Sequence, residues 1–129
     1  MGTPMRSRFI EDDEQKALFQ WLGMKARPDY PTNLAFAIPM GGKRDPREAA
    51  RMKTQGSKAG VPDLMLPVAR GGYHGLFIEM KRPIVKGQSK PVISPEQRYW
   101  LESLAEQGYK SIVCYGAPEA ITAITEYLE

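Results

Sequence analysis

Cysteine and histidine are almost absent from this chain, which has one of each, Cys114 and His74, among 129 residues. A single cysteine excludes an internal disulfide framework, and the two residues together are too few for a zinc site of cysteines and histidines. Long apolar runs are also missing: the stretch at residues 34–38 is far shorter than the roughly 20 residues of a membrane span. No apolar segment follows the basic residues 1–8, so nothing predicts a secretory signal. We therefore expect a cytoplasmic protein with no membrane segment.

The composition is otherwise that of an ordinary folded protein, with 42% hydrophobic and 26% charged residues. These values exclude a disordered tail, a collagen-like fibre and a coiled coil. The length fits one domain and leaves little room for a second. We predict a single domain over residues 1–129.

The net charge of +3 is small, but the basic residues are unevenly distributed. Two segments, 42–60 and 81–98, hold most of the excess, whereas acidic residues collect at 11–14 and near the C-terminus. This pattern favours a polyanionic partner such as nucleic acid. The alternative is a solvated surface that happens to be basic. The candidate DNA-binding residues are Lys43, Arg44, Arg47, Arg51, Lys53 and Lys58.

Apolar spacing and turn residues predict four helices and four strands. Asp45-Pro46 and Ser94-Pro95 each place a capping side chain before a proline at the first helical position. Pro67 interrupts one strand and predicts an edge strand or a bulge there. In chain order we expect a helix at 11–25, a buried strand at 34–38, a helix from 46 to about 56, strands at 62–69 and 73–81, a helix from 95 to 108, a strand at 110–115 and a helix from 118.

Three charged residues fall on the two strands in the middle of this pattern. Residues two apart in a strand share a face, so Glu79 and Lys81 project together. If residues 70–72 form a three-residue hairpin loop, the strand pairing that follows from this loop places Asp63 opposite Glu79, within roughly 5 Å between Cβ atoms. A hard divalent cation such as Mg²⁺ would resolve the repulsion between the two carboxylates. The alternative is a surface cluster in which Lys81 pairs with one of the acids.

The order Pro62-Asp63, then Glu79-Met80-Lys81, resembles the signature of the restriction-endonuclease-like nuclease superfamily. Within it, the chain resembles the VRR-NUC family over almost its whole length. The one visible departure is Met40, where similar sequences carry an asparagine. The segments that carry the resemblance are Glu14-Gln15 with Trp21, Ala37-Ile38-Pro39 with Gly41-Gly42, Gly60-Val61-Pro62-Asp63-Leu64, Gly75-Leu76-Phe77-Ile78-Glu79-Met80-Lys81, Ser94-Pro95-Glu96-Gln97 with Trp100, and Gly108-Tyr109.

This resemblance implies an α/β fold with a restriction-endonuclease-like core, in which helices flank a mixed β-sheet. It also implies a site that holds Mg²⁺ or Mn²⁺ through Asp63, Glu79 and the backbone carbonyl of Met80, with Lys81 as the catalytic lysine. Two further residues match the site by resemblance, Glu14 on the first helix and Gln97 on the helix that begins at Pro95. Glu11 competes for the role of Glu14, and a capping box alone would explain Gln97.

The function that the resemblance implies is hydrolysis of DNA phosphodiester bonds by a bacterial or phage-encoded, metal-dependent endonuclease. Stand-alone family members resemble structure-specific enzymes, including those that act on four-way (Holliday) junctions, and the expected assembly is a homodimer. A chain of this length has no separate module for reading base sequence. Two alternatives stay open: a sequence-specific restriction-type endonuclease, and a catalytically inactive DNA-binding protein of the same fold.

Overall fold

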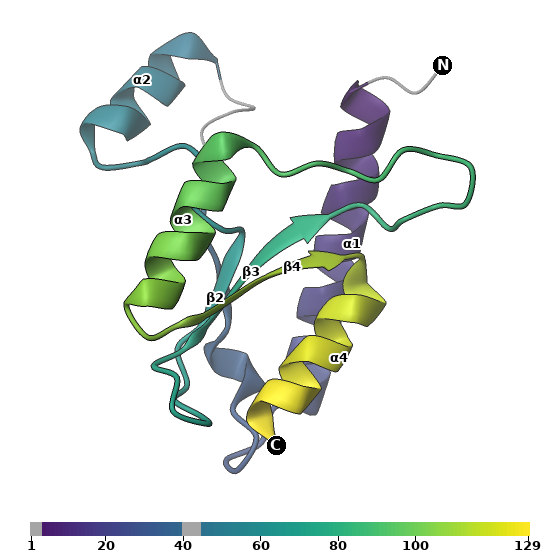
Figure 1. Ribbon diagram of the computed structural model, residues 1–129, viewed down its shortest axis with the longest axis vertical. Helices are drawn as coiled ribbons and strands as arrows, with labels where there is room; N and C mark the ends of the chain where they lie inside the picture. The colour runs from purple at the N-terminus through teal and green to yellow at the C-terminus, as the bar shows by residue number, and fades with distance from the viewer. Residues whose placement is uncertain (1–3, 40–44) are drawn as a thin grey trace.

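The computed structural model describes residues 4–39 and 45–129, with side chains from residue 10 onward. The elements follow the predicted order, with one added turn of 3₁₀ helix (Figure 1). Five predicted boundaries also agree with the structure: the end of the first helix, the starts of the second and third helices, and both ends of the last strand. The elements are α1 (Pro4–Lys25), η1 (Thr32–Leu34), β1 (Phe36–Ala37), α2 (Pro46–Thr54), β2 (Leu64–Leu66), β3 (Leu76–Lys81), α3 (Pro95–Glu106), β4 (Lys110–Tyr115) and α4 (Ala117–Leu128).

The four strands form one mixed sheet in the order β1-β2-β3-β4. The pairs β1–β2 and β2–β3 are antiparallel, whereas β3 and β4 are parallel. Leu64 pairs with Ile78 and Leu66 with Leu76, which is the register predicted from the hairpin. The α/β class and the mixed sheet are therefore confirmed.

The turn of this hairpin differs from the predicted three-residue loop. Arg70 and Tyr73 form a bridge around the two glycines at 71 and 72, and both glycines have positive φ. Between this bridge and the Leu66–Leu76 pair, residues 67–69 on one strand face residues 74–75 on the other. The extra residue lies in the segment of Pro67 and offsets the shift of register that the shorter turn would have caused. The edge strand predicted there as the other possibility is wrong, because β2 lies between β1 and β3.

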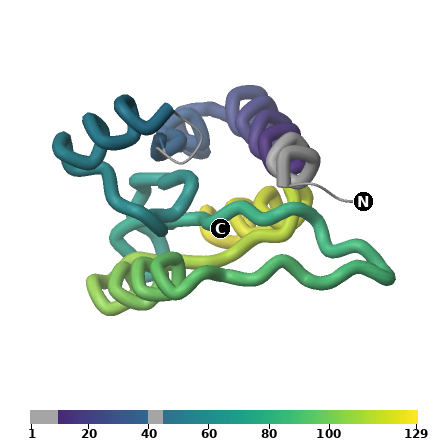
Figure 2. Tube along the Cα trace, turned by 90° about the horizontal axis from the view of Figure 1, so that it is seen from above, coloured from purple at the N-terminus to yellow at the C-terminus, as the bar shows by residue number. Residues whose placement is uncertain are grey.

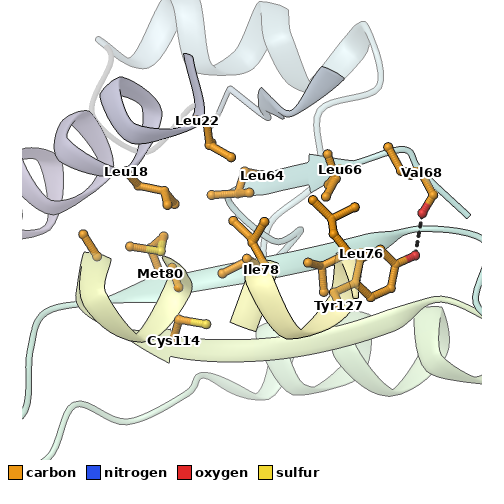
Figure 3. Packing of buried hydrophobic residues seen from close by; sticks show 14 residues of the cluster. Leu18, Leu22, Leu64, Leu66, Val68, Leu76, Ile78, Met80, Cys114 and Tyr127 are labelled. Carbon is orange, nitrogen blue, oxygen red and sulfur yellow. Dashed lines mark hydrogen bonds between the residues drawn. The ribbon is translucent and has the colours of Figure 1, made fainter. Parts of the chain in front are cut away.

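The main core lies between the sheet and the helices α1 and α4 (Figure 3). Leu18 and Leu22 of α1 lie over Leu64 of β2 and Ile78 of β3, while α4 covers the same face of β3 and β4. Cys114 is buried in this cluster, as predicted. The helix α3 covers the opposite face of the sheet (Figure 2). The result is a three-layer arrangement in which one face of β3 belongs to the apolar core and the other faces α3.

The predicted buried strand at 34–38 is wrong in both length and burial. Its first residue belongs to η1, only Phe36–Ala37 form β1, and both of these residues are exposed. Leu34 and Phe36 each remain 47% exposed. The reason is topological: β1 is an edge strand, and apolar composition alone does not tell an edge from the middle of a sheet.

Two segments stand away from this core. Helix α2 contains no buried residue, and residues 82–93 form a long excursion between β3 and α3 (Figure 2). The two lie on opposite sides of the molecule. Within the described residues, no helix is both long enough and apolar enough to cross a membrane.

Candidate active site

The sheet places Asp63, Glu79 and Lys81 on one face, the face covered by α3. Leu64, Ile78 and Met80 point into the core beneath α1 and α4. Because side chains alternate along a strand, their neighbours at 63, 79 and 81 point to the other side. The observed β2–β3 pairing ends at Leu64 and Ile78, and Asp63 N donates to the Ile78 carbonyl at 3.0 Å. The side chains of Asp63 and Glu79 are joined by a hydrogen bond. The juxtaposition predicted from the sequence is therefore present.

Glu79 is the charged centre of this cluster and is only 4% exposed. Burial is the main reason that the pKa of Glu79 rises from 4.5 to about 9, and the neighbouring Asp63 carboxylate raises it further. A side-chain hydrogen bond with Asp63 and the charge of Glu11 act in the same direction, whereas Lys81 opposes the rise. In the metal-free protein, the neighbouring carboxyl groups of Asp63 and Glu79 therefore retain a proton to a higher pH than an isolated glutamate would.

The backbone of Met80 ties Asp63 to β3. The Met80 N–H donates to Asp63 Oδ2 at 2.6 Å. On the other side of the strand, the carbonyl of Lys81 accepts from Gly116 N at 2.9 Å. Successive carbonyls of a strand point to opposite sides, so the Met80 carbonyl faces the side on which Asp63 lies. This arrangement brings two carboxylates and one backbone carbonyl to the same place.

Gln97, in the first turn of α3, connects the two other charged residues. Its Nε2 donates to Glu79 Oε2 at 3.0 Å, and its Oε1 accepts from Lys81 Nζ at 3.1 Å. Lys81 Nζ itself lies 3.9 Å from Glu79 Oε2. The same Gln97 oxygen accepts from Ser94 N at 2.9 Å, which completes a capping box. Gln97 therefore both caps α3 and contacts Glu79 and Lys81.

Glu14 contacts the start of α4. Its Oε1 accepts from Ala117 N at 2.6 Å, at the start of α4. Glu11, one helical turn earlier, is the α1 acid whose charge acts on Glu79. The structure therefore brings the charge of Glu11 into the surroundings of Glu79, and the role of Glu14 stays a prediction.

Gly60 is a residue that the sequence reasoning did not assign to the site. It is buried with a φ of +88°, and a Cβ there would lie 2.5 Å from the backbone carbon of Glu96. Only glycine permits this approach between the segment that leads to Asp63 and the first turn of α3, which carries Gln97. The signal was available in the sequence as a glycine three residues before Asp63.

The predicted DNA-binding residues that the structure describes are all exposed. Arg47, Arg51 and Lys53 project from α2, and Lys58 lies in the loop after it. Lys43 and Arg44, like Met40, lie outside the described residues. His74 packs against Gly108 and Tyr109 at the far end of β3, so it is not near Glu79.

The donor set at this site consists of oxygen atoms only. Asp63 and Glu79 supply carboxylates and Met80 supplies a carbonyl, which suits a hard cation such as Mg²⁺ or Mn²⁺. Within the described side chains, no cluster of three or more acidic, histidine or cysteine residues forms a metal cage. Two carboxylates fit the coordination preference of Mg²⁺, which usually keeps water and substrate phosphate as its other ligands.

The mixed sheet presents an aspartate beside a Glu-x-Lys strand, and a helix glutamine bridges the glutamate and the lysine. This combination defines a class of protein, the restriction-endonuclease-like nucleases. The profile of the VRR-NUC domain matches residues 11–118 of the chain. The chain belongs to the VRR-NUC family, a family of nucleases with this fold. A solved structure described as a VRR_NUC domain protein is 34% identical, with a TM-score of 0.75, over 92% of this chain and 87% of the other. A search of curated proteins found no match.

The raised pKa of Glu79 makes the stability of the metal-free protein depend on pH. Unfolded Glu79 ionises near 4.5 and folded Glu79 near 9, so the free energy of unfolding in EDTA should fall as pH rises between these values. Glu79→Gln removes this proton and should flatten the profile. At pH 8 the variant should be more stable than wild type by at least about 1.4 kcal/mol, the equivalent of one pKa unit.

Urea unfolding at a series of pH values, followed by the fluorescence of Trp21 and Trp100, measures this effect. Glu102→Gln, on the exposed face of α3, is the matched control and should keep the wild-type profile. Parallel profiles for wild type and Glu79→Gln would mean that Glu79 ionises normally in the folded protein.

Proposed function

We propose that the chain is a Mg²⁺- or Mn²⁺-dependent endonuclease that hydrolyses phosphodiester bonds in branched DNA. The observation that carries this proposal is the buried Glu79 carboxylate, which lies beside Asp63 on the face where Lys81 and Gln97 meet. A buried carboxylate beside a second, half-buried acid is costly unless a cation or a shared proton compensates their charge. A divalent cation would offset the repulsion between the two carboxylates, because both would then be its ligands.

Asp63, Glu79 and the Met80 carbonyl would hold the cation. When bound, it supplies a Lewis acid for the phosphate and lowers the pKa of a coordinated water. Loading requires Glu79 to release its proton, so cation binding should be tighter at higher pH. Met80 N–H keeps the Asp63 carboxylate aimed at the site through its hydrogen bond.

Lys81 would act on the reacting phosphate. Its ammonium group lies on the same face as both acids and donates to Gln97 Oε1 at 3.1 Å. From this position it orients the attacking water and stabilises the negative charge that develops in the transition state. Gln97 holds Lys81 and Glu79 at fixed places without adding charge, because a neutral amide donates to one and accepts from the other.

The basic residues of α2 fit a duplex phosphate backbone. Arg47, Arg51 and Lys53 are exposed on a helix that buries nothing in the protein core. Phosphate contacts position a protein on DNA without reading its sequence. This property supports recognition of DNA shape rather than of a base sequence, as expected for a junction- or flap-directed enzyme.

Substitution of the site residues tests the chemistry. Asp63→Asn and Glu79→Gln each remove a cation ligand, and Lys81→Ala removes a charge needed mainly in the transition state. Each should lower the cleavage rate of a labelled four-way junction in Mg²⁺ by at least about 100-fold, and EDTA should abolish cleavage by wild type. Asp29→Asn and Lys25→Ala, both exposed and outside the site, should cleave at the wild-type rate. Wild-type activity of Glu79→Gln in Mg²⁺ would falsify the site assignment.

The salt dependence of binding tests the path of the DNA. Arg51→Ala/Lys53→Ala should weaken binding to all sequences. It should also reduce the slope of log affinity against log salt by about one unit for each phosphate that the protein no longer neutralises. Lys25→Ala/Lys110→Ala removes the same amount of charge at positions outside α2. If both double variants show the same slope, α2 does not touch the DNA backbone.

Symmetric cleavage of a four-way junction needs two active sites, and each chain offers one. A C₂ homodimer supplies both through a single interface. Light scattering should give a mass near twice 14.5 kDa, and paired nicks should appear at symmetry-related positions of the junction. A monomer at micromolar concentration that trims only flaps or ends would exclude junction resolution and leave a simpler structure-specific nuclease.

A further inference from the structure

The excursion between β3 and α3, here called the 82–93 loop, carries charge of one sign only. It contains Arg82, Lys86 and Lys90, and it has no acidic residue. Neither a helix nor a strand forms in it. Its charge therefore complements a polyanion and disfavours contact with the same loop of a second copy.

The same loop exposes apolar side chains. Ile84 is 52% exposed, Val85 is 46% exposed and Val92 is 82% exposed. Single exposed apolar residues are common on protein surfaces, but a group of them in one projecting segment indicates a surface that meets a partner. Ile84 and Val85 are adjacent to Lys86, so apolar and cationic groups occur together.

Hydrogen bonds within the loop hold it in shape. Arg82 Nη2 donates to the carbonyl of Ser89 at 2.8 Å, which links the two arms, and Gln88 N donates to the carbonyl of Val85 at 3.0 Å. Lys90 Nζ lies 4.9 Å from the centre of the Tyr115 ring, at the end of β4. The apolar side chains are thus presented by a braced segment, which lowers the entropic cost of binding.

Both ends of the loop belong to the active site. It begins directly after Lys81 and ends directly before Ser94, whose N–H donates to Gln97 Oε1. The end of β3 and the start of α3 lie between this loop and α2, which occupy opposite sides of the molecule (Figures 1 and 2). A DNA molecule that contacts both α2 and the loop would pass over Asp63 and Glu79.

We infer that the 82–93 loop is a wedge for branched DNA, in which Ile84 and Val85 contact unstacked bases while Lys86 and Lys90 contact the flanking phosphates. This inference rests on the proposed function and names the feature of DNA that the enzyme recognises. Apolar side chains inserted at a base step stabilise an opened stack, which costs least where stacking is already interrupted, as at a branch point. Regular duplex offers no such position.

Binding without cleavage tests the wedge. Wild type and Ile84→Ser/Val85→Ser are titrated in Ca²⁺ with a four-way junction and with a continuous duplex of equal length, each carrying 2-aminopurine at the centre. The double variant should lose about tenfold or more in affinity for the junction and little for the duplex. The 2-aminopurine fluorescence rise seen with wild type on the junction should disappear. Met24→Ser, which removes an apolar side chain that is 81% exposed on the last turn of α1, should behave as wild type.

Two outcomes would overturn the wedge while leaving the nuclease intact. One is an unchanged ratio of junction to duplex affinity in the double variant. The other is a difference in sedimentation between the double variant and wild type, both without DNA, which would make the loop an interface between copies. Failure of the proposed function would give another result. Wild type would cleave no DNA in Mg²⁺, yet the double variant would still bind the junction more weakly than wild type does. Absence of all DNA binding by wild type would overturn both.

Discussion

The burial of Glu79 beside Asp63 is the constraint on which the site depends. A carboxyl group that is almost fully covered by protein is unfavourable when charged, and a second carboxylate next to it makes the charge less favourable still. The carboxyl group of Glu79 lies on the face of β3 that α3 covers, whereas the other face of the same strand packs into the apolar core. One strand, β3, therefore contributes residues both to the apolar core and to the candidate active site.

The first turn of α3 stabilises this arrangement with groups that also start the helix. Ser94 and Gln97 cap each other, and the side chain of Gln97 continues to Lys81 and Glu79. Gly60 allows the chain before Asp63 to touch the backbone of the same helix turn. As a result, the position of α3 and the geometry of the charged residues are coupled, and a shift of the helix start would disturb both.

The sequence predicted the parts of this fold that depend on local patterns. Proline and capping residues located the starts of α2 and α3, and strand alternation together with the hairpin placed Asp63 opposite Glu79. The approach of Gly60 to α3 and the face on which α1 packs are long-range properties that no local pattern reports. For this reason the apolar residues 34–38 were expected to be buried although β1 lies at an edge.

The parallel pairing of β3 with β4 affects when during synthesis the nuclease becomes complete. The site residue Glu79 lies on β3, but its covering helix α3 and its neighbouring strand β4 follow later in the chain. Glu14 meets Ala117 across 103 positions of sequence. Contacts so distant in sequence form late, because loop closure must precede them. A nascent chain therefore displays the basic helix α2 before α3 and β4 complete the face that carries Asp63, Glu79 and Lys81.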